Sequence, residues 1–133
     1  MKIADVEGIG PKFAAKLEAA GIKTTEELLK RGAKPKGREE IEKATGIGHS
    51  QILEWVNHVD LYRIDGVGSE YSDLLEEAGV DSPAELAQRV PANLAAKIAE
   101  VNAKKKLVRR VPTEAVVAGW IAQAKKLPKV VEH

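Results

Sequence analysis

One motif occurs twice in the chain, and this repetition limits what the chain can fold into. The sequence Gly8-Ile9-Gly10-Pro11-Lys12 returns as Gly66-Val67-Gly68-Ser69-Glu70, at an offset of 58 residues. The correspondence continues as far as Leu28, and a later segment repeats at an offset of 65, where Trp55 corresponds to Trp120. The chain is therefore predicted to be a tandem duplication of units of roughly sixty residues.

Composition narrows the class of protein. The chain has 133 residues, of which 44% are hydrophobic and 31% charged, enough for one compact domain or two small ones. It has no cysteine, which excludes disulfides and thiolate chemistry, and we expect a cytoplasmic protein without a membrane span or signal peptide. The net charge of +1 is lower than that of most dedicated nucleic-acid binders.

The local sequence signals are almost all helical. Phe13, Leu17 and Ala20 form an apolar stripe on one predicted helix, which Gly21 ends. Further helices are expected at about 38–44, 49–61, 91–101 and 112–126. Pro35 and Gly37 are expected to interrupt the chain before residue 38, whereas the strand signals at 107–108 and 130–131 are too short to build a sheet.

Two helix starts carry the same capping signal. Thr24 precedes Glu27 by three residues, and Ser82 precedes Glu85 by the same spacing at the matching position of the repeat. The predicted fold class is therefore all-α. We expect a first unit at 1–60 and a divergent second unit at 61–128, and residues 129–133 are treated as a tail outside the fold.

A Gly-x-Gly turn with an apolar middle residue, placed between two helices, can bind a ligand. The glycines let another backbone approach closely, and Ile9 or Val67 is expected to plug the core. The next helix begins at once, so its free N–H groups and the positive end of its dipole favour an anion, to which Lys12 would add a charge. The same turn can also be purely structural, and both interpretations stay open.

The sequence resembles a known motif. Residues 6–17, followed by Ala20-Gly21-Ile22, are similar to a helix-hairpin-helix motif, and Thr45-Gly46-Ile47-Gly48 is similar to its partner hairpin. The whole chain also resembles a family of small bacterial and archaeal proteins that contain two such units, folded as SAM-like small helical bundles. Related units in Holliday-junction, excision-repair, ligase and polymerase proteins grip DNA backbones without reading the base sequence.

The resemblance implies a set of contacts. It places phosphate binding on the two hairpins of the first unit, with a monovalent cation held at a hairpin as a further option and no other cofactor. Carried over to this sequence, the nucleic-acid contacts would be Gly8, Ile9, Gly10, Lys12, Gly46, Gly48 and His49.

The second unit departs from the pattern. Glu70 replaces Lys12 and Asp65 precedes the glycines, so this hairpin is predicted to be structural. The fourth hairpin position has no Gly-x-Gly but carries a basic connection that could add electrostatic affinity. Its cations are Lys104, Lys105, Lys106, Arg109 and Arg110. A second basic stretch runs over residues 30–38, and either stretch could equally be a solvated loop.

Other chemistry has little support in the sequence. His49 and His58 are too far apart for a close pair of metal ligands, and no serine has a credible base partner, so we expect no metal site and no catalytic residues. Trp55 and Trp120 are expected in the core. The predicted function is a nucleic-acid-binding accessory module, with DNA the expected partner and no enzymatic activity. The alternative is a helical protein–protein adaptor whose hairpins are structural.

Overall fold

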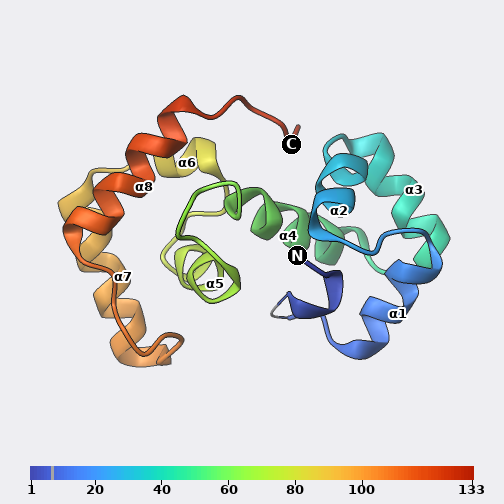
Figure 1. Cartoon of the computed structure of the whole chain (residues 1–133), viewed down its shortest axis with the longest axis horizontal. Helices are drawn as coiled ribbons and strands as arrows, with labels where there is room; N and C mark the ends of the chain where they lie inside the picture. The colour runs from blue at the N-terminus through green and yellow to red at the C-terminus, as the bar shows by residue number, and fades with distance from the viewer. Residues whose placement is uncertain (7) are drawn as a thin grey trace. The chain divides into compact units, whose positions relative to one another are not determined.

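The computed structural model describes residues 1–6 and 8–133, and in them the chain is all-α (Figure 1). A short 3-10 helix precedes eight α-helices, and the described residues contain one isolated bridge, between Lys2 and Thr24, and no strand. None of these helices combines the length and the apolar character that a membrane crossing requires. The elements are η1 (Ile3–Asp5), α1 (Pro11–Ala19), α2 (Thr25–Gly32), α3 (Pro35–Thr45), α4 (His49–Leu61), α5 (Ser69–Glu77), α6 (Pro83–Ala87), α7 (Pro91–Lys105) and α8 (Glu114–Lys126).

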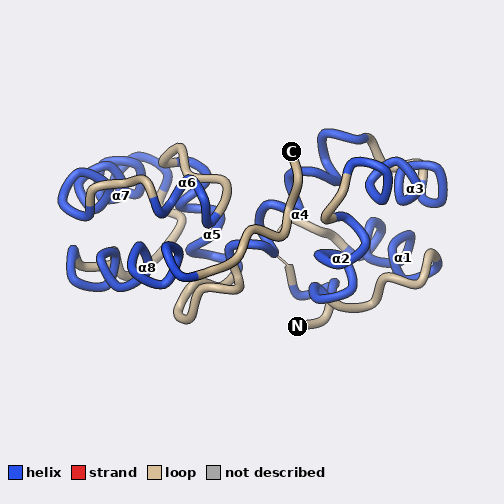
Figure 2. The backbone as a smooth tube through the Cα atoms, turned by 90° about the horizontal axis from the view of Figure 1, so that it is seen from above, coloured by secondary structure: helices blue, strands red, loops and turns tan. Residues whose placement is uncertain are grey.

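The chain forms two compact units. Unit 1 consists of Met1–Asp60 together with Val130–His133, and unit 2 consists of Leu61–Lys129. In each unit, short loops join the helices (Figure 2). Residues 130–133, expected to lie outside the fold, instead belong to unit 1, where Val131 is buried. That expectation was wrong because an apolar residue close to a helical unit gains stability by burial, wherever it lies in the sequence.

The helix boundaries follow the two sequence offsets. The first and last residues of α5 lie 58 positions after those of α1, and those of α8 lie 65 positions after those of α4. The intervening helices differ more, since α6 is shorter than α2 and α7 is longer than α3. The two units thus use the same order of helices, and a gene duplication stays a prediction from the sequence.

Both predicted caps form. The Thr24 hydroxyl accepts a hydrogen bond from the Glu27 N–H at 3.1 Å, and the Ser82 hydroxyl accepts one from the Glu85 N–H at 3.1 Å. These bonds satisfy amides that a helix start leaves without partners. The start of α2 and the start of α6 are therefore fixed in the same way in the two units.

An arginine closes the end of the preceding helix in each unit. Arg31 donates to the carbonyl of Ala20 at 2.6 Å, and Arg89 donates to the carbonyl of Gly79 at 2.9 Å. These carbonyls lie just after α1 and α5, where helices leave acceptors unpaired. Arg31 was counted in a basic stretch that could bind phosphate, and this hydrogen bond gives it a structural role within unit 1.

An aromatic pair lies in each core. The rings of Phe13 and Trp55 are 5.3 Å apart in unit 1, and those of Tyr71 and Trp120 are 5.3 Å apart in unit 2. Both indoles are buried. The prediction that the tryptophans pack in the core is confirmed, and the tilted ring geometry is a favourable one for aromatic pairs.

The start of α3 differs from its prediction. Pro35 is the first residue of this helix and does not precede it, because proline is well suited to a position whose N–H needs no helical partner. Gly37 lies inside the helix, where a Cβ atom would come within 1.9 Å of the Arg31 carbonyl oxygen. This glycine therefore allows two backbone segments to approach closely, and it does not break the helix.

Candidate functional site

The first hairpin of unit 1 is built from two glycines with different roles. Gly8 has φ of +90°, a conformation that residues with side chains rarely adopt. Gly10 has φ of −75° and is the N-cap of α1. Glycine is therefore required by the backbone at position 8, whereas position 10 would accept other residues.

Ile9 is the plug of this hairpin. Its side chain is buried, as predicted, and its N–H donates to the Val6 carbonyl at 3.1 Å. The side chain and the amide of Ile9 are thus both engaged inside unit 1, so the expectation that Ile9 contacts nucleic acid stays a prediction without support from these two groups. Ile9 instead holds the flanking glycines at the surface.

The glycines of both unit 1 hairpins lie beneath open space. All four are exposed, and a Cβ atom placed on any of them would meet no non-adjacent atom of the described chain within 4 Å. The backbone at these points can thus be approached closely by a ligand. These glycines are Gly8, Gly10, Gly46 and Gly48.

The start of α1 offers donors and a cation. Pro11 occupies the first turn and has no N–H, so the free amides of this turn are those of Lys12 and Phe13. The Lys12 side chain is exposed, and the first turn of α1 contains no acidic residue. The helix start therefore carries positive potential that no carboxylate of its own turn offsets.

The second hairpin joins α3 to α4. Gly46 caps α3 with φ of +74°, and its N–H donates to the Glu42 carbonyl at 2.8 Å. The Thr45 hydroxyl donates to the Ile41 carbonyl at 2.7 Å and accepts from the Ile47 N–H at 3.2 Å. Ile47 is buried as the second plug.

The helix that follows this hairpin also begins without a carboxylate. His49 is exposed and is the first residue of α4, and the first turn of α4 has no acidic residue. Both hairpins of unit 1 therefore lead into helices whose first turns contain no carboxylate to offset the positive end of the helix dipole.

The third hairpin, in unit 2, has the same backbone. Gly66 has φ of +93°, and the Val67 N–H donates to the Ile64 carbonyl at 3.0 Å, as in the first hairpin. Gly66 is more crowded than Gly8, because a Cβ atom there would lie 3.2 Å from the indole nitrogen of Trp120. Glu70 stands in the first turn of α5, where Lys12 stands in α1.

Asp65 does not distinguish the third hairpin from the first. Glu7, which lies outside the described residues, holds the same position in the sequence of the first repeat. The backbone of Asp65 is held by Gln123, which accepts from its N–H at 2.8 Å and donates to its carbonyl at 3.2 Å. The difference between the two hairpins thus rests on Lys12 and Glu70.

At the fourth hairpin position, the helix that follows is capped by a side chain of the hairpin itself. Thr113 caps α8, and its hydroxyl accepts from the Val116 N–H at 3.2 Å. Glu114 then opens α8 at the position that His49 holds in α4. Sequence reasoning missed Glu114, although the offset of 65 residues that pairs Trp55 with Trp120 also pairs it with His49.

The basic connection between α7 and α8 is partly neutralised. Lys104 lies 3.9 Å from a carboxylate oxygen of Glu100, and Lys105 forms an ion pair with Glu77. All of these side chains are substantially exposed, so each pair contributes little to stability. The pairs do reduce the positive potential that Lys104 and Lys105 present to an anion.

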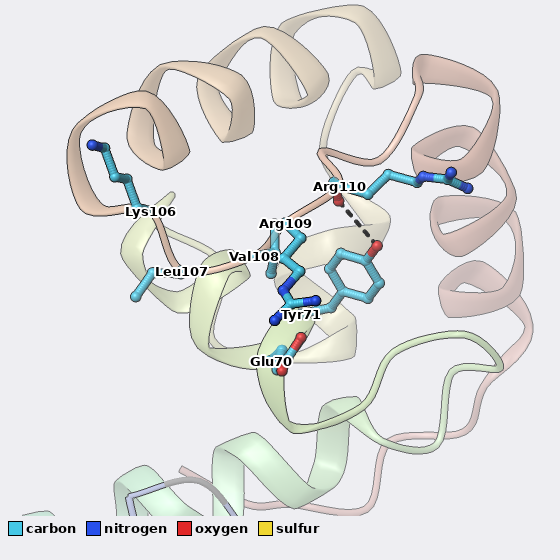
Figure 3. A pocket seen from close by; sticks show the side chains of 7 residues that line it. All are labelled: Glu70, Tyr71, Lys106, Leu107, Val108, Arg109 and Arg110. Atoms are coloured by element: carbon cyan, nitrogen blue, oxygen red, sulfur yellow. Dashed lines mark hydrogen bonds between the residues drawn. The ribbon is translucent and has the colours of Figure 1, made fainter.

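The remaining cations of the connection line a pocket in unit 2 (Figure 3). The Tyr71 hydroxyl donates to the Arg110 carbonyl at 3.1 Å, and Figure 3 shows the Arg109 side chain directed toward Glu70. The pocket has a volume of about 680 Å³. It is lined by Glu70, Tyr71, Lys106, Leu107, Val108, Arg109 and Arg110.

Two features order this connection. The Asn102 side chain donates to the Val108 carbonyl at 3.1 Å and accepts from its N–H at 3.0 Å. Lys106 caps α7 with φ of +51°, the only positive φ among the described non-glycine residues. Gly46 holds the corresponding left-handed cap at the end of α3, so unit 2 uses a strained lysine where unit 1 uses glycine.

The fold and the hairpins define an all-α protein with two intact Gly-x-Gly turns in one unit and one in the other. The chain belongs to the family described as Domain of unknown function (DUF4332), whose model matches residues 7–127. No curated protein and no solved structure matches the chain. The family description assigns no activity, so the function has to be argued from the two units themselves.

Proposed function

We propose that the chain binds the phosphate backbone of a nucleic acid, expected to be DNA, through the two hairpins of unit 1. The observation that carries this proposal is the open space above the four exposed glycines, next to two helix starts that contain no carboxylate. A helix start of this kind attracts anions through its free amides and its dipole.

The proposed contacts divide into backbone and side-chain groups. The amides at the starts of α1 and α4 donate to phosphate oxygens, and Lys12 adds an ionic contact beside the first hairpin. His49 lies at the same place beside the second. Contacts to phosphate position a protein on nucleic acid but carry no base information, so the binding is expected to be independent of sequence.

Unit 2 would add affinity for nucleic acid through its positive charges alone. Lys106, Arg109 and Arg110 are exposed, and they are held on an ordered connection. Lys104 and Lys105 are expected to contribute less, because Glu100 and Glu77 already lie beside them.

An adaptor function is the second candidate, and observations in unit 2 favour it. Glu70 and Glu114 place carboxylates at the two helix starts that would otherwise attract phosphate. Val90 is 55% exposed and Val116 is 45% exposed, and both lie in this unit. Isolated exposed valines are common on protein surfaces, so these features support the adaptor less than the open glycines support nucleic-acid binding.

The test is to fill the space above the unit 1 hairpins. Gly10→Ala and Gly48→Ala, combined, add methyl groups where the backbone conformation accepts them, because neither glycine has a positive φ. Hydrogen bonds to a charged group contribute about 1.5–3 kcal/mol each, so losing one at each of the two hairpins should weaken DNA binding by at least about a hundredfold. Fluorescence anisotropy with a short duplex at low salt measures this loss.

Gly68→Ala is the matched control. Gly68 is the N-cap of α5, as Gly10 is of α1, and it also has open space above it. This variant should bind DNA like the parent chain while losing similar helix-cap stability. Equal binding by all three proteins, with intact helical circular dichroism, would assign the hairpins a structural role and favour the adaptor.

A further inference from the structure

Residues 130–133 occupy a defined place on unit 1. The side chain of Val131 is 2% exposed, and the Glu132 N–H donates to the Ala33 carbonyl at 2.7 Å. The His133 ring lies 2.8 Å from the side-chain oxygen of Asn57, a residue of α4. The segment thus combines one buried apolar residue with hydrogen bonds to the C-cap of α2 and to α4.

A buried arginine depends on this segment. Arg38 is 2% exposed, and its guanidinium donates to the Gly32 carbonyl at 2.8 Å and to the Glu132 carbonyl at 2.7 Å. Burial lowers the pKa of Arg38, and the charge of Glu132 opposes that shift. A buried charge needs acceptors, and the Glu132 carbonyl supplies one of them to the guanidinium of Arg38.

The Arg38 site was missed in the sequence because Arg38 lies in a run of basic residues. Its burial follows from its position in α3, opposite the carbonyls at the end of α2. We call the part of unit 1 that residues 131–133 cover, which includes Ala33, Arg38 and Asn57, the segment slot of unit 1.

The connection into the segment slot is short. The Pro128 carbonyl accepts a hydrogen bond from Arg63 at 2.7 Å, and both residues belong to unit 2. Only residues 129–131 separate Pro128 from Glu132, which is bound to Arg38 in unit 1. A short connection between two anchored points restricts the chain, and such hinges favour exchange of the same element between two copies.

We propose that the segment slot is a docking site for an extended peptide with a buried valine, and that its partner is residues 130–133 of a second copy of this chain. The segment of the second copy offers the same valine, the same carbonyl for Arg38 and the same N–H for Ala33. The contacts in the exchanged dimer are therefore identical to those that the segment makes within its own chain. Reciprocal exchange gives a closed two-fold dimer. The proposal does not depend on nucleic-acid binding.

The first test supplies the segment in trans. The full chain carrying Val131→Lys should leave its own slot empty, because a lysine cannot fill the site of a buried valine without burying a charge. A labelled peptide with the sequence of residues 127–133 should then bind saturably in an anisotropy titration. The same peptide with Val131→Lys should bind at least about tenfold more weakly, as expected from the loss of about 1.5–3 kcal/mol of valine burial.

The full chain carrying Lys129→Ala is the matched control. Lys129 is exposed, so its own segment should stay docked and compete with the peptide. Weaker peptide binding by this control than by the Val131→Lys chain supports the proposal. Absence of peptide binding to a Val131→Lys chain with parental helical circular dichroism overturns it.

A second test covers the case in which Val131→Lys does not fold. Light scattering on the unmodified chain, over a range of concentrations, should detect a dimer. Inserting four glycines between Lys129 and Val130 should reduce the dimer fraction, because a longer connection restricts docking within the same chain less than the native connection does. A chain that stays monomeric at millimolar concentration, or a dimer unaffected by the insertion, would contradict the exchange.

Discussion

Unit 1 and unit 2 carry opposite charges where their hairpins meet the following helices. In unit 1, Lys12 and His49 stand at the starts of α1 and α4, whereas Glu70 and Glu114 stand at the same places in α5 and α8. A carboxylate at a helix start stabilises the helix through its dipole. Unit 2 thus has a carboxylate in the first turn of both helices, whereas the corresponding first turns of unit 1 have none.

The shared features of the units are the ones that support the fold. Each unit has a buried plug, a capped second helix, an arginine on the preceding carbonyl and an aromatic pair. The differences in charge at the helix starts lie on exposed positions that packing does not restrict. The two units thus keep the same arrangement of helices and turns while the charge at their helix starts is reversed.

The largest expected effect tests the equivalence of the two cores. Trp55→Ala and Trp120→Ala each remove a buried indole, and each should destabilise its own unit by about 3–5 kcal/mol. Urea unfolding followed by circular dichroism measures the change in the free energy of unfolding. A loss below about 1 kcal/mol for either variant would show that the two aromatic pairs are not equivalent.

The next comparison concerns the left-handed helix caps. Gly46→Ala forces a side chain into a positive φ and should destabilise the chain by about 1–2 kcal/mol. Lys106→Gly relieves the same strain in unit 2 and should stabilise the chain by about 1 kcal/mol. Thermal unfolding should shift in opposite directions for the two variants. A destabilising Lys106→Gly would mean that the lysine side chain stabilises the connection by more than the backbone strain costs.

The arginines that bind the helix ends should both stabilise their units. Arg31→Ala removes a hydrogen bond to a carbonyl after α1 and should lower the free energy of unfolding by about 1 kcal/mol. Arg89→Ala removes the corresponding bond after α5 together with the bonds to Glu85, and should lower it by at least as much. If Arg31 also bound phosphate, its replacement would reduce DNA affinity more than that of Arg89 does. We expect equal, small effects on binding in an anisotropy titration.

The smallest expected effect is on the salt dependence of binding. Replacing Lys104, Lys105 and Lys106 together by glutamine would reduce the salt slope by up to about three units if each lysine neutralised a phosphate. Because Lys104 and Lys105 already lie beside carboxylates, we expect a reduction nearer one unit. A reduction of three units would assign unit 2 a direct part in the interface.

The sequence predicted the features that repeat and missed those that depend on packing between distant residues. Helical periodicity and capping spacings located most helices, and matched positions placed both tryptophans in the core. The packing of Gly37 against the Arg31 carbonyl, and the burial of Arg38 under Glu132, require two segments that no local pattern brings together. Ile9 was assigned to the interface because a motif shows which residues form a turn and not which of their amides are already bonded.

Exchanging the charges at the helix starts distinguishes a nucleic-acid interface on unit 1 from one on unit 2. One variant carries Lys12→Glu and His49→Glu, and the other carries Glu70→Lys and Glu114→Lys. The first should be slightly more stable than the parent, by about 0.3–1 kcal/mol at each helix start, so a loss of binding cannot be ascribed to unfolding.

The measurement is the affinity of both variants for one DNA duplex at low salt, by fluorescence anisotropy. We expect the unit 1 exchange to weaken DNA binding at least about tenfold, since it replaces a phosphate contact with a repulsion. The unit 2 exchange should leave binding unchanged or tighten it. Parental binding by the unit 1 variant, together with lost binding by the unit 2 variant, would contradict the account and place the interface on unit 2.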